Sequence, residues 1–216
     1  AYRVKVLGEE TDLREVPSVV AGDKASRHSI ILAKSIPAKK YGIQTGEPLF
    51  QALEKCPELV VIPPDYDLYV QASRHFVDML RQFSPAVEQY SIDEAWVDMT
   101  GTQRLWGPPR LAAELMRRRI NEELGFTVNI GISSNKLLAK MAGDFEKPNK
   151  VHTLFPEEMG EKFFPLPVRD LFLVGAATER KLQRLGIYTI GALAAADVRV
   201  LKKRLGKQGE LLWHFA

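Results

Sequence analysis

The sequence of 216 residues lacks the features that would assign it to several large classes of protein. Its one cysteine, Cys56, cannot form an internal disulfide, which fits a reducing compartment. No apolar run approaches the roughly 18 residues of a membrane span, and no basic-then-apolar signal segment opens the chain. The four histidines are not spaced as zinc ligands, and no Walker-type or G-x-G-x-x-G phosphate loop is present. We therefore expect a cytoplasmic protein that contacts no membrane.

The charge of the chain is small and uneven. The net charge is +3, which by itself does not require a nucleic-acid partner, and the hydrophobic content of 45% is ordinary for a globular protein. The excess of positive charge lies entirely after Pro156, and its densest part is residues 199–204. A basic run of this kind is either a solvated helix face or a surface for an anionic partner.

Hydrophobic periodicity predicts an α+β fold. Strands are expected at 18–23, 29–34, 59–62, 126–132 and 151–155, and helical segments at 37–42, 47–55, 65–83, 111–124 and 135–145. With a strand–turn–strand hairpin after residue 83, the order from residue 65 is helix, strand, strand, helix, strand, helix, strand, which favours helices packed on one face of a sheet. Short helices separated by glycine and proline follow residue 156, so the last part of the chain is expected to be all-helical.

Two adjacent carboxylates, Asp93 and Glu94, lie between short apolar runs in the predicted hairpin. A continuous strand would direct them to opposite faces, so only a tight turn or a bulge would let both reach one point. If they converge, a proton, a basic partner or a divalent cation must relieve their repulsion. Mg²⁺ suits such oxygen ligands when it also handles phosphates. The alternative is a solvated acidic hairpin tip.

A second cluster is rich in lysine. Lys136 and Lys140 share one face of the predicted helix at 135–145, and Asp144, one turn further on, can offset their repulsion. Lys147 precedes Pro148, which bars continuation of the helix, so it belongs to a loop. The cluster is either an exposed face with ordinary salt bridges or a row of cations that meets phosphates.

The motifs in these two clusters closely resemble those of the Y-family translesion DNA polymerases, and most of all those of the DNA polymerase IV branch. The resemblance rests on the motif S-I-D-E-A-W-V-D at 91–98, on G-I-S-S-N-K-L-L-A-K-M-A-G-D at 131–144, and on K-P-N at 147–149. It spans essentially the whole chain in the order of the family. It implies a ferredoxin-like palm with helices on one face of a mixed sheet, small α/β fingers and a helical thumb. The implied boundaries are fingers at 1–65, including a truncated palm element, palm at 66–155 and thumb at 156–216.

The resemblance also implies roles for individual residues. Asp93 and Glu94 match the carboxylates that hold the two Mg²⁺ ions of the complete enzyme, and Lys147 matches the lysine that binds the triphosphate. Ser91 is expected to brace the hairpin by a local hydrogen bond. Asp98 and Asp144 match motif acids that we interpret as structural supports. Lys136 and Lys140 are candidates for contacts with DNA phosphates or for support.

The fingers and thumb depart from the family pattern. Ile36 and Lys39 stand where the family often has tyrosine and arginine, and Lys39 can bind phosphate only as a point charge. In the thumb, residues 173–175 read Leu-Val-Gly where a helix-hairpin-helix turn would have Gly-Ile-Gly, so only Gly175 is kept. Such a turn presents backbone N–H groups to DNA, although Gly175 could equally be a packing turn. A second turn at 205–209 makes Lys207 a further candidate for DNA contact.

The implied function is template-directed addition of deoxynucleotides to a primer, during repair or tolerance of DNA damage. Its implied partners are primer–template DNA, deoxynucleoside triphosphates and, through segments beyond the chain, a sliding clamp, so we expect association with the nucleoid. The family's first metal-binding aspartate and the aromatic residue that excludes ribonucleotides would precede Ala1, so we expect little extension from these 216 residues alone. The alternatives are a non-catalytic DNA-binding relative, or an unrelated nucleotide-binding fold, for which no phosphate loop is visible.

Overall fold

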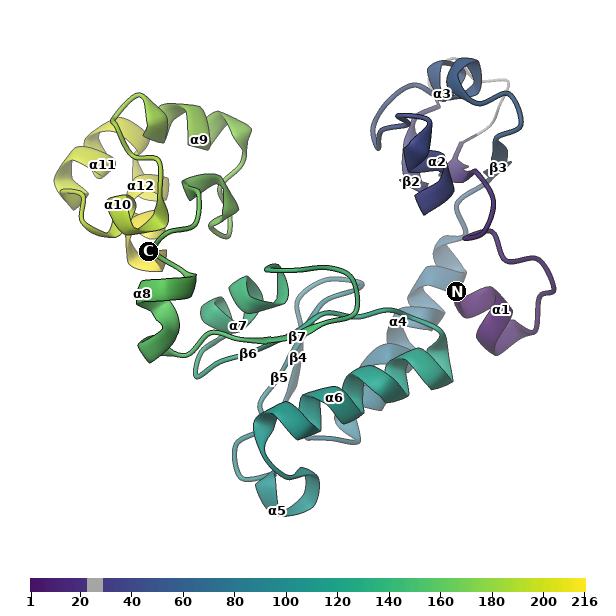
Figure 1. The fold of residues 1–216 in the computed structure, drawn as a ribbon, viewed down its shortest axis with the longest axis horizontal. Coiled ribbons are helices and arrows are strands. Elements are labelled where there is room, and N and C mark those ends of the chain that lie inside the picture. The colour runs from purple at the N-terminus through teal and green to yellow at the C-terminus, as the bar shows by residue number, and fades with distance from the viewer. Residues whose placement is uncertain (23–28) are drawn as a thin grey trace. The chain divides into compact units, whose positions relative to one another are not determined.

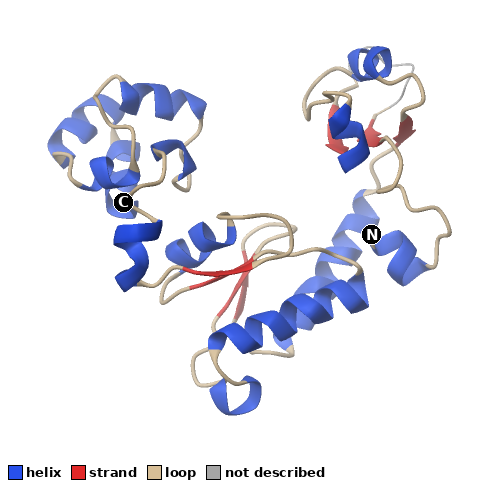
Figure 2. Cartoon of the chain, viewed as in Figure 1, coloured by secondary structure: helices blue, strands red, loops and turns tan. Residues whose placement is uncertain are grey.

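The computed structural model describes residues 1–22 and 29–216, so the end of the first predicted strand and the turn after it lie outside the described residues. The described chain forms two compact units. Unit 1 comprises Ala1–Met99 and Arg119–Phe126, and unit 2 comprises Thr100–Arg118 and Thr127–Ala216. Figure 2 shows both helices and short strands, and the last part of the chain is helical, as expected for the α+β class. No helix in the described ranges combines the length and the apolar character that a membrane span needs.

Unit 1 contains a three-stranded sheet and a hairpin. Its elements are α1 (Tyr2–Leu7), β1 (Ser18–Ala21), β2 (Ile31–Lys34), α2 (Ile36–Lys40), α3 (Leu49–Lys55), β3 (Val60–Ile62), α4 (Tyr66–Arg81), β4 (Val87–Gln89), β5 (Ala95–Val97) and the π-helix Ile120–Leu124. In the sheet, β1 pairs antiparallel with β2 and parallel with β3, and β4 pairs antiparallel with β5. Helix α1 was not predicted from the sequence, and the predicted order of elements is confirmed from β1 to the hairpin.

The sheet of unit 1 is covered by a small apolar core. Val19, Ile31 and Leu49 are almost completely buried there, and Cys56 is a buried free thiol. Burial raises the pKa of the Cys56 thiol, so the residue acts as a small apolar side chain in the core. Fully burying one aliphatic side chain contributes about 1.5–3 kcal/mol, so a handful of such residues stabilises a sheet of this size.

Unit 2 holds a parallel strand pair and a cluster of helices, both visible in Figure 1. Its elements are α5 (Gln103–Trp106), α6 (Pro109–Arg119, whose last residue belongs to unit 1), β6 (Ile130–Ile132), α7 (Lys136–Gly143), β7 (Val151–Thr153), α8 (Met159–Lys162), α9 (Ala176–Gln183), α10 (Ile190–Ala194), α11 (Val198–Leu205) and α12 (Lys207–Phe215), with 3₁₀ turns at Pro156–Glu158 and Val168–Asp170. β6 pairs parallel with β7. Residues after 156 form helices and turns, as predicted.

Three elements differ from the sequence prediction. The helix predicted at 111–124 is α-helical only to Arg119 and ends as a π-helix, whose terminal residues Ile120 and Leu124 are buried. The strand predicted at 126–132 begins only at Ile130, because the Phe126 ring stacks on Tyr2 instead of continuing the strand. The expected mixed sheet appears in the described residues as two separate strand pairs, one antiparallel and one parallel.

Candidate active site

The acidic loop, residues 90–94, joins β4 to β5. Two successive backbone N–H groups, those of Tyr90 and Ser91, donate to the carbonyl oxygen of Glu94 at 2.9 and 3.1 Å. Two residues facing one partner is the arrangement of a β-bulge, which bends the strand and re-aims its side chains. The sequence required a tight turn or bulge for the two carboxylates to converge, and this loop contains that feature.

The side chain of Ser91 braces the loop, as predicted. Its hydroxyl donates to Oδ1 of Asp93 at 2.8 Å, and its oxygen lies 3.4 Å from the backbone nitrogen of Asp93. Asp93 is exposed, whereas Glu94 is half-buried. A carboxylate held by a neighbouring hydroxyl and open to solvent can accept a cation with little rearrangement. Within the described ranges, no cluster of three or more His, Cys, Asp or Glu side chains could hold a metal ion.

A residue of helix α4 holds the same loop in place through hydrogen bonds. The buried hydroxyl of Ser73 donates to the carbonyl oxygen of Ile92 at 2.5 Å, and it accepts from Nε2 of Gln89 at 3.0 Å. The Gln89 amide also donates to the carbonyl oxygen of Ser91 at 2.9 Å. These bonds tie the loop to a helix whose N-terminus is capped by Asp65. The loop is therefore fixed by long-range contacts as well as by its own turn.

Helix α7, which carries Lys136 and Lys140, packs tightly against β6. Asn135 caps the helix, because its Oδ1 accepts from the backbone N–H of Leu138 at 2.9 Å. Gly131 on β6 lies so close to the helix that a Cβ there would be 1.9 Å from the carbonyl oxygen of Ala139. The backbone of α7 therefore rests directly on β6, and Gly131 is required for that approach. Lys136 begins the helix and is exposed.

A single carboxylate joins two of the predicted lysines. Nζ of Lys140 lies 3.2 Å from Oδ2 of Asp144, and Nζ of Lys147 lies 2.8 Å from Oδ1 of the same residue. Burial would raise the pKa of Asp144, but the hydrogen bonds from Lys147 and Lys140 outweigh it, so the pKa lies below its usual value. The predicted offset of the lysine repulsion by Asp144 is confirmed, and Lys147 lies in a loop, as expected.

Lys39 occupies the last turn of α2. The helix is capped by Ser35, whose Oγ accepts from the backbone N–H of Ala38 at 3.2 Å. Lys39 is exposed, and Ile36 on the same short helix is 71% exposed.

The turn before α9 has a backbone conformation that favours glycine, although its first residue is Leu173. Leu173 has a φ of 68°, in the left-handed region that favours glycine, and its side chain is 48% exposed. Gly175 is the N-cap of α9, and nothing lies within 4 Å of a Cβ built there. The first N–H groups of a helix have no intrahelical partner, so this end can face an anion.

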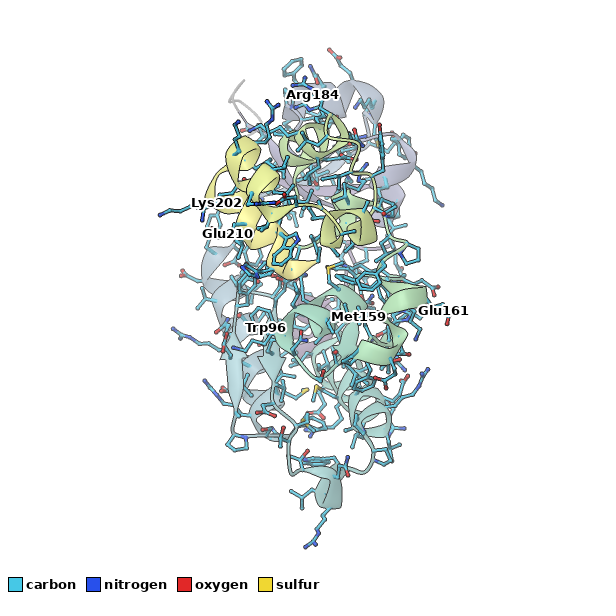
Figure 3. All side chains as sticks on the ribbon, turned by 90° about the vertical axis from the view of Figure 1, so that its left-hand side faces the viewer. Trp96, Met159, Glu161, Arg184, Lys202 and Glu210 are labelled. Atoms are coloured by element: carbon cyan, nitrogen blue, oxygen red, sulfur yellow. The ribbon has the colours of Figure 1, made fainter. Side chains whose placement is uncertain are left out.

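A second turn with glycines joins α11 to α12. Gly206 has a φ of 67°, and a Cβ on the buried Gly209 would lie 2.4 Å from the carbonyl oxygen of Leu201, so both positions favour glycine. Lys207 begins α12 and is exposed. In Figure 3, Lys202 of α11 lies beside Glu210 of α12, and their charged atoms are 2.8 Å apart. Lys202, one of the basic residues at 199–204, is therefore paired with a carboxylate.

Within single units, the structure brings some of the predicted residues together. Asp93 and Glu94 share one loop, Lys136 and Lys140 share α7, and Lys140 and Lys147 share Asp144. Lys39 lies on α2, Gly175 is the N-cap of α9, and Lys207 begins α12. Sequence reasoning missed Ser73. The available signal was a hydroxyl whose neighbours at helical spacing, Val70 and Val77 among them, are apolar.

Comparison with known proteins decides the family. The sequence pattern of the impB/mucB/samB family matches residues 2–144, two thirds of the chain. The chain belongs to the impB/mucB/samB family. Asp93, Glu94, Lys136, Lys140 and Asp144 all lie within the matched residues.

Curated relatives of this impB/mucB/samB chain are named DNA polymerase IV. It is 49% identical over 209 residues to DNA polymerase IV of Clostridium acetobutylicum, and the alignment covers 97% of this chain and 52% of the relative. It is 46% identical over 201 residues to DNA polymerase IV of Moorella thermoacetica, and that alignment covers 93% of this chain and 50% of the relative. The chain therefore spans about half the length of the curated relatives it matches.

Solved structures give the same answer for the fold. DinB from Sulfolobus solfataricus superimposes with a TM-score of 0.83 at 26% identity, covering 100% of this chain and 64% of that one. A Y-family DNA polymerase chimera, Dbh-Dpo4(243-245)-Dbh, also gives 0.83 at 26% identity, covering 92% and 59%. The resemblance to Y-family polymerases and the corresponding α+β fold are confirmed.

Proposed function

We propose that the protein containing this chain is a translesion DNA polymerase, which adds deoxynucleotides to a primer as directed by a template. The single observation that carries the proposal is the braced acidic loop, which presents Asp93 and Glu94 in a chain whose relatives are named DNA polymerase IV. None of the relatives supports the non-catalytic alternative. The proposed subdomains are fingers at 1–65, palm at 66–155 and thumb at 156–216.

In this proposal, Asp93 and Glu94 are metal ligands. They supply carboxylate oxygens, the donors that Mg²⁺ prefers, and two protein carboxylates leave room for the phosphates and waters that complete its coordination. Two bound Mg²⁺ ions would activate the attacking primer oxygen and stabilise the leaving pyrophosphate. Ser91 holds Asp93 in the loop, and Ser73 holds the backbone of the loop against α4.

Two lysines are proposed to bind the incoming nucleotide. Lys147 is 62% exposed in its side chain and has the reach of a loop residue, so its ammonium can meet a phosphate. Lys39 is exposed at the end of α2 and offers a second point charge. Because Ile36 cannot hydrogen-bond, nucleotide affinity is expected to depend more on charge, and hence on salt, than in relatives with tyrosine there.

The remaining predicted residues are proposed to contact DNA or to support the residues that do. Lys136 and Lys207 would neutralise backbone phosphates, and Lys140, paired with Asp144, would support the site beside the DNA. The turn at Gly175 would offer backbone N–H groups without reading sequence. A sliding clamp, bound through segments beyond this chain, and a location at the bacterial nucleoid complete the proposal.

The test is template-directed incorporation by the full-length protein. With a primer–template of defined sequence, each deoxynucleotide is supplied alone, with Mg²⁺ or with chelator, on an undamaged template and on one carrying an abasic site. The proposal expects Mg²⁺-dependent incorporation opposite the undamaged base that changes when the template base is changed, and extension past the abasic site. Binding of DNA with no incorporation under any of these conditions would contradict it.

A further inference from the structure

Asp144 holds two lysines that differ strongly in their freedom to move. Lys140 lies on α7 and is 21% exposed in its side chain, whereas Lys147 lies in the following loop and is 62% exposed. Their ammonium groups meet opposite oxygens of the same carboxylate. Asp144 therefore pairs with one cation on the helix and with a second, more exposed cation on the loop.

The backbone around Lys147 is pinned, so the side chain alone can exchange partners. The amide of Asn129 donates to the carbonyl oxygens of Gly143 and Glu146 at 3.0 and 2.6 Å. Its Oδ1 accepts from the backbone N–H of Lys150 at 3.2 Å. One residue therefore fixes the chain on both sides of Lys147, and a change of partner needs only rotation of the lysine side chain.

We propose that Asp144 is an internal counter-ion that competes with a polyphosphate for Lys147, while Lys140 keeps the carboxylate in place. The inference rests on the proposed role of Lys147 in nucleotide binding and makes Asp144 a positioning residue for that lysine. When a triphosphate arrives, Lys147 leaves the carboxylate, which keeps one cation and so is not left without a partner. When pyrophosphate is the remaining anion, the return of Lys147 to Asp144 helps to release it.

The charge state of Asp144 supports this competition. Although burial acts against ionisation, its lysine partners lower its pKa below the usual value, so the group is a full anion at neutral pH. An exposed ion pair of this kind is weak, so a polyphosphate with several negative charges can displace it.

The experiment measures binding of inorganic tripolyphosphate to the 216-residue chain by titration calorimetry at low, fixed ionic strength. Asp144→Asn is expected to tighten binding about three- to fivefold, the upper part of the range that an exposed ion pair contributes. The matched control is Glu146→Gln, which removes the same charge from the same loop, where Glu146 meets Lys150 at 3.6 Å with both side chains at least half exposed. The control is expected to change affinity less than twofold.

A double-mutant comparison identifies the lysine involved. Lys147→Ala should weaken tripolyphosphate binding, and Asp144→Asn should lose most of its effect in that background. If Asp144→Asn changes affinity no more than Glu146→Gln, or weakens binding, the counter-ion role is overturned while the phosphate role of Lys147 stands. If Lys147→Ala binds as the unmodified chain does, the phosphate role of Lys147 fails and the inference fails with it.

A measurement on the unmodified chain covers the case in which a variant does not fold. The carboxyl carbon of Asp144 is titrated by NMR with and without tripolyphosphate. Loss of Lys147 to the ligand removes one stabilising cation, so the pKa of Asp144 should rise on binding. An unchanged pKa at saturating tripolyphosphate would overturn the inference.

Discussion

Replacement of Gly131 by alanine tests the contact that sets the lysine helix on its strand. A Cβ at this position would lie 1.9 Å from the carbonyl oxygen of Ala139 and 2.4 Å from the backbone nitrogen of Gly143. Both atoms belong to the backbone of α7, so no side-chain rotation relieves the clash, and the helix must move away from β6. The movement opens the core around Leu138 and Met141, which are 4% and 2% exposed.

The expected cost is large. Overpacking a well-filled core typically costs about 1–3 kcal/mol, and a clash with backbone lies at the upper end, so we expect about 3 kcal/mol. For a unit of roughly a hundred residues, each kcal/mol lowers the melting temperature by about 4–8 °C, which predicts a fall of about 12 °C or more. Urea and thermal unfolding followed by circular dichroism measure both quantities.

Gly143 offers a matched control on the same contact. A Cβ there would come no closer than 3.5 Å to the nitrogen of Gly131, an ordinary distance, and the residue lies in the last turn of α7. Gly143→Ala is therefore expected to be neutral or to stabilise the chain by up to about 1 kcal/mol. If Gly131→Ala unfolds within 1 kcal/mol of the unmodified chain, the reasoning about the packing of α7 is refuted.

Three further changes test separate parts of the structure. Leu173→Gly should raise the free energy of unfolding by up to about 1 kcal/mol in urea titrations, because glycine removes the strain of a φ of 68°, whereas Leu173→Ala, which keeps that strain, should bring no gain. Ser73→Ala should cost about 1–3 kcal/mol in the same titrations, because the carbonyl of Ile92 and the amide of Gln89 lose a buried partner, and a cost near zero would contradict the anchoring of the acidic loop. The hydrogen bond from Lys162 lowers the pKa of Glu158 from 4.5 to about 2, so its contribution is complete above about pH 4.5 and is lost as the pH falls towards 2. Unfolding measured across that range should converge with that of Glu158→Gln at the acid end, and a constant difference would contradict the assignment.

The order of elements was predictable because each carries a local signal. The polar turns, the prolines after residue 56 and the helical spacing of α4 all appear in the sequence, and they match the observed elements. The extent of α4's buried face was less predictable. Tyr66, Val70, Val77 and Leu80 lie on one face at helical spacing, yet Tyr66 and Val70 are exposed whereas Val77 and Leu80 are buried. Spacing predicts that a helix is amphipathic, but the neighbours of the helix decide how much of its apolar face is covered.

The site was predictable where its contacts are local and unpredictable where they are long-range. The hydrogen bond from Ser91 to Asp93 spans two residues, and the pair of Lys140 and Asp144 spans one helical turn, so both follow from sequence distance. The bond from Ser73 to the acidic loop spans 19 residues, and no spacing rule indicates it.

Tertiary contacts also overrode local propensity at single residues. Asn129 lies in the alternating apolar and polar pattern that predicts a strand at 126–132, but its amide holds the loop that carries Lys147. At position 173, the surrounding turn imposes a glycine-like backbone on a leucine. In both cases the surrounding structure, rather than the residue's own preference, determines the conformation.

The most direct test of the central claim is the effect of Asp93→Asn on the chemical step of the full-length protein. The change removes one charge from the acidic loop and keeps the size of the side chain. Loss of a metal ligand should lower single-nucleotide incorporation by roughly 10³-fold in rapid-quench measurements, with primer–template affinity changed less than threefold. Asp78→Asn, which removes an exposed carboxylate paired with Arg81 on α4, should leave both unchanged. Incorporation by Asp93→Asn at the rate of the unmodified protein would contradict the assignment of the acidic loop as the catalytic centre.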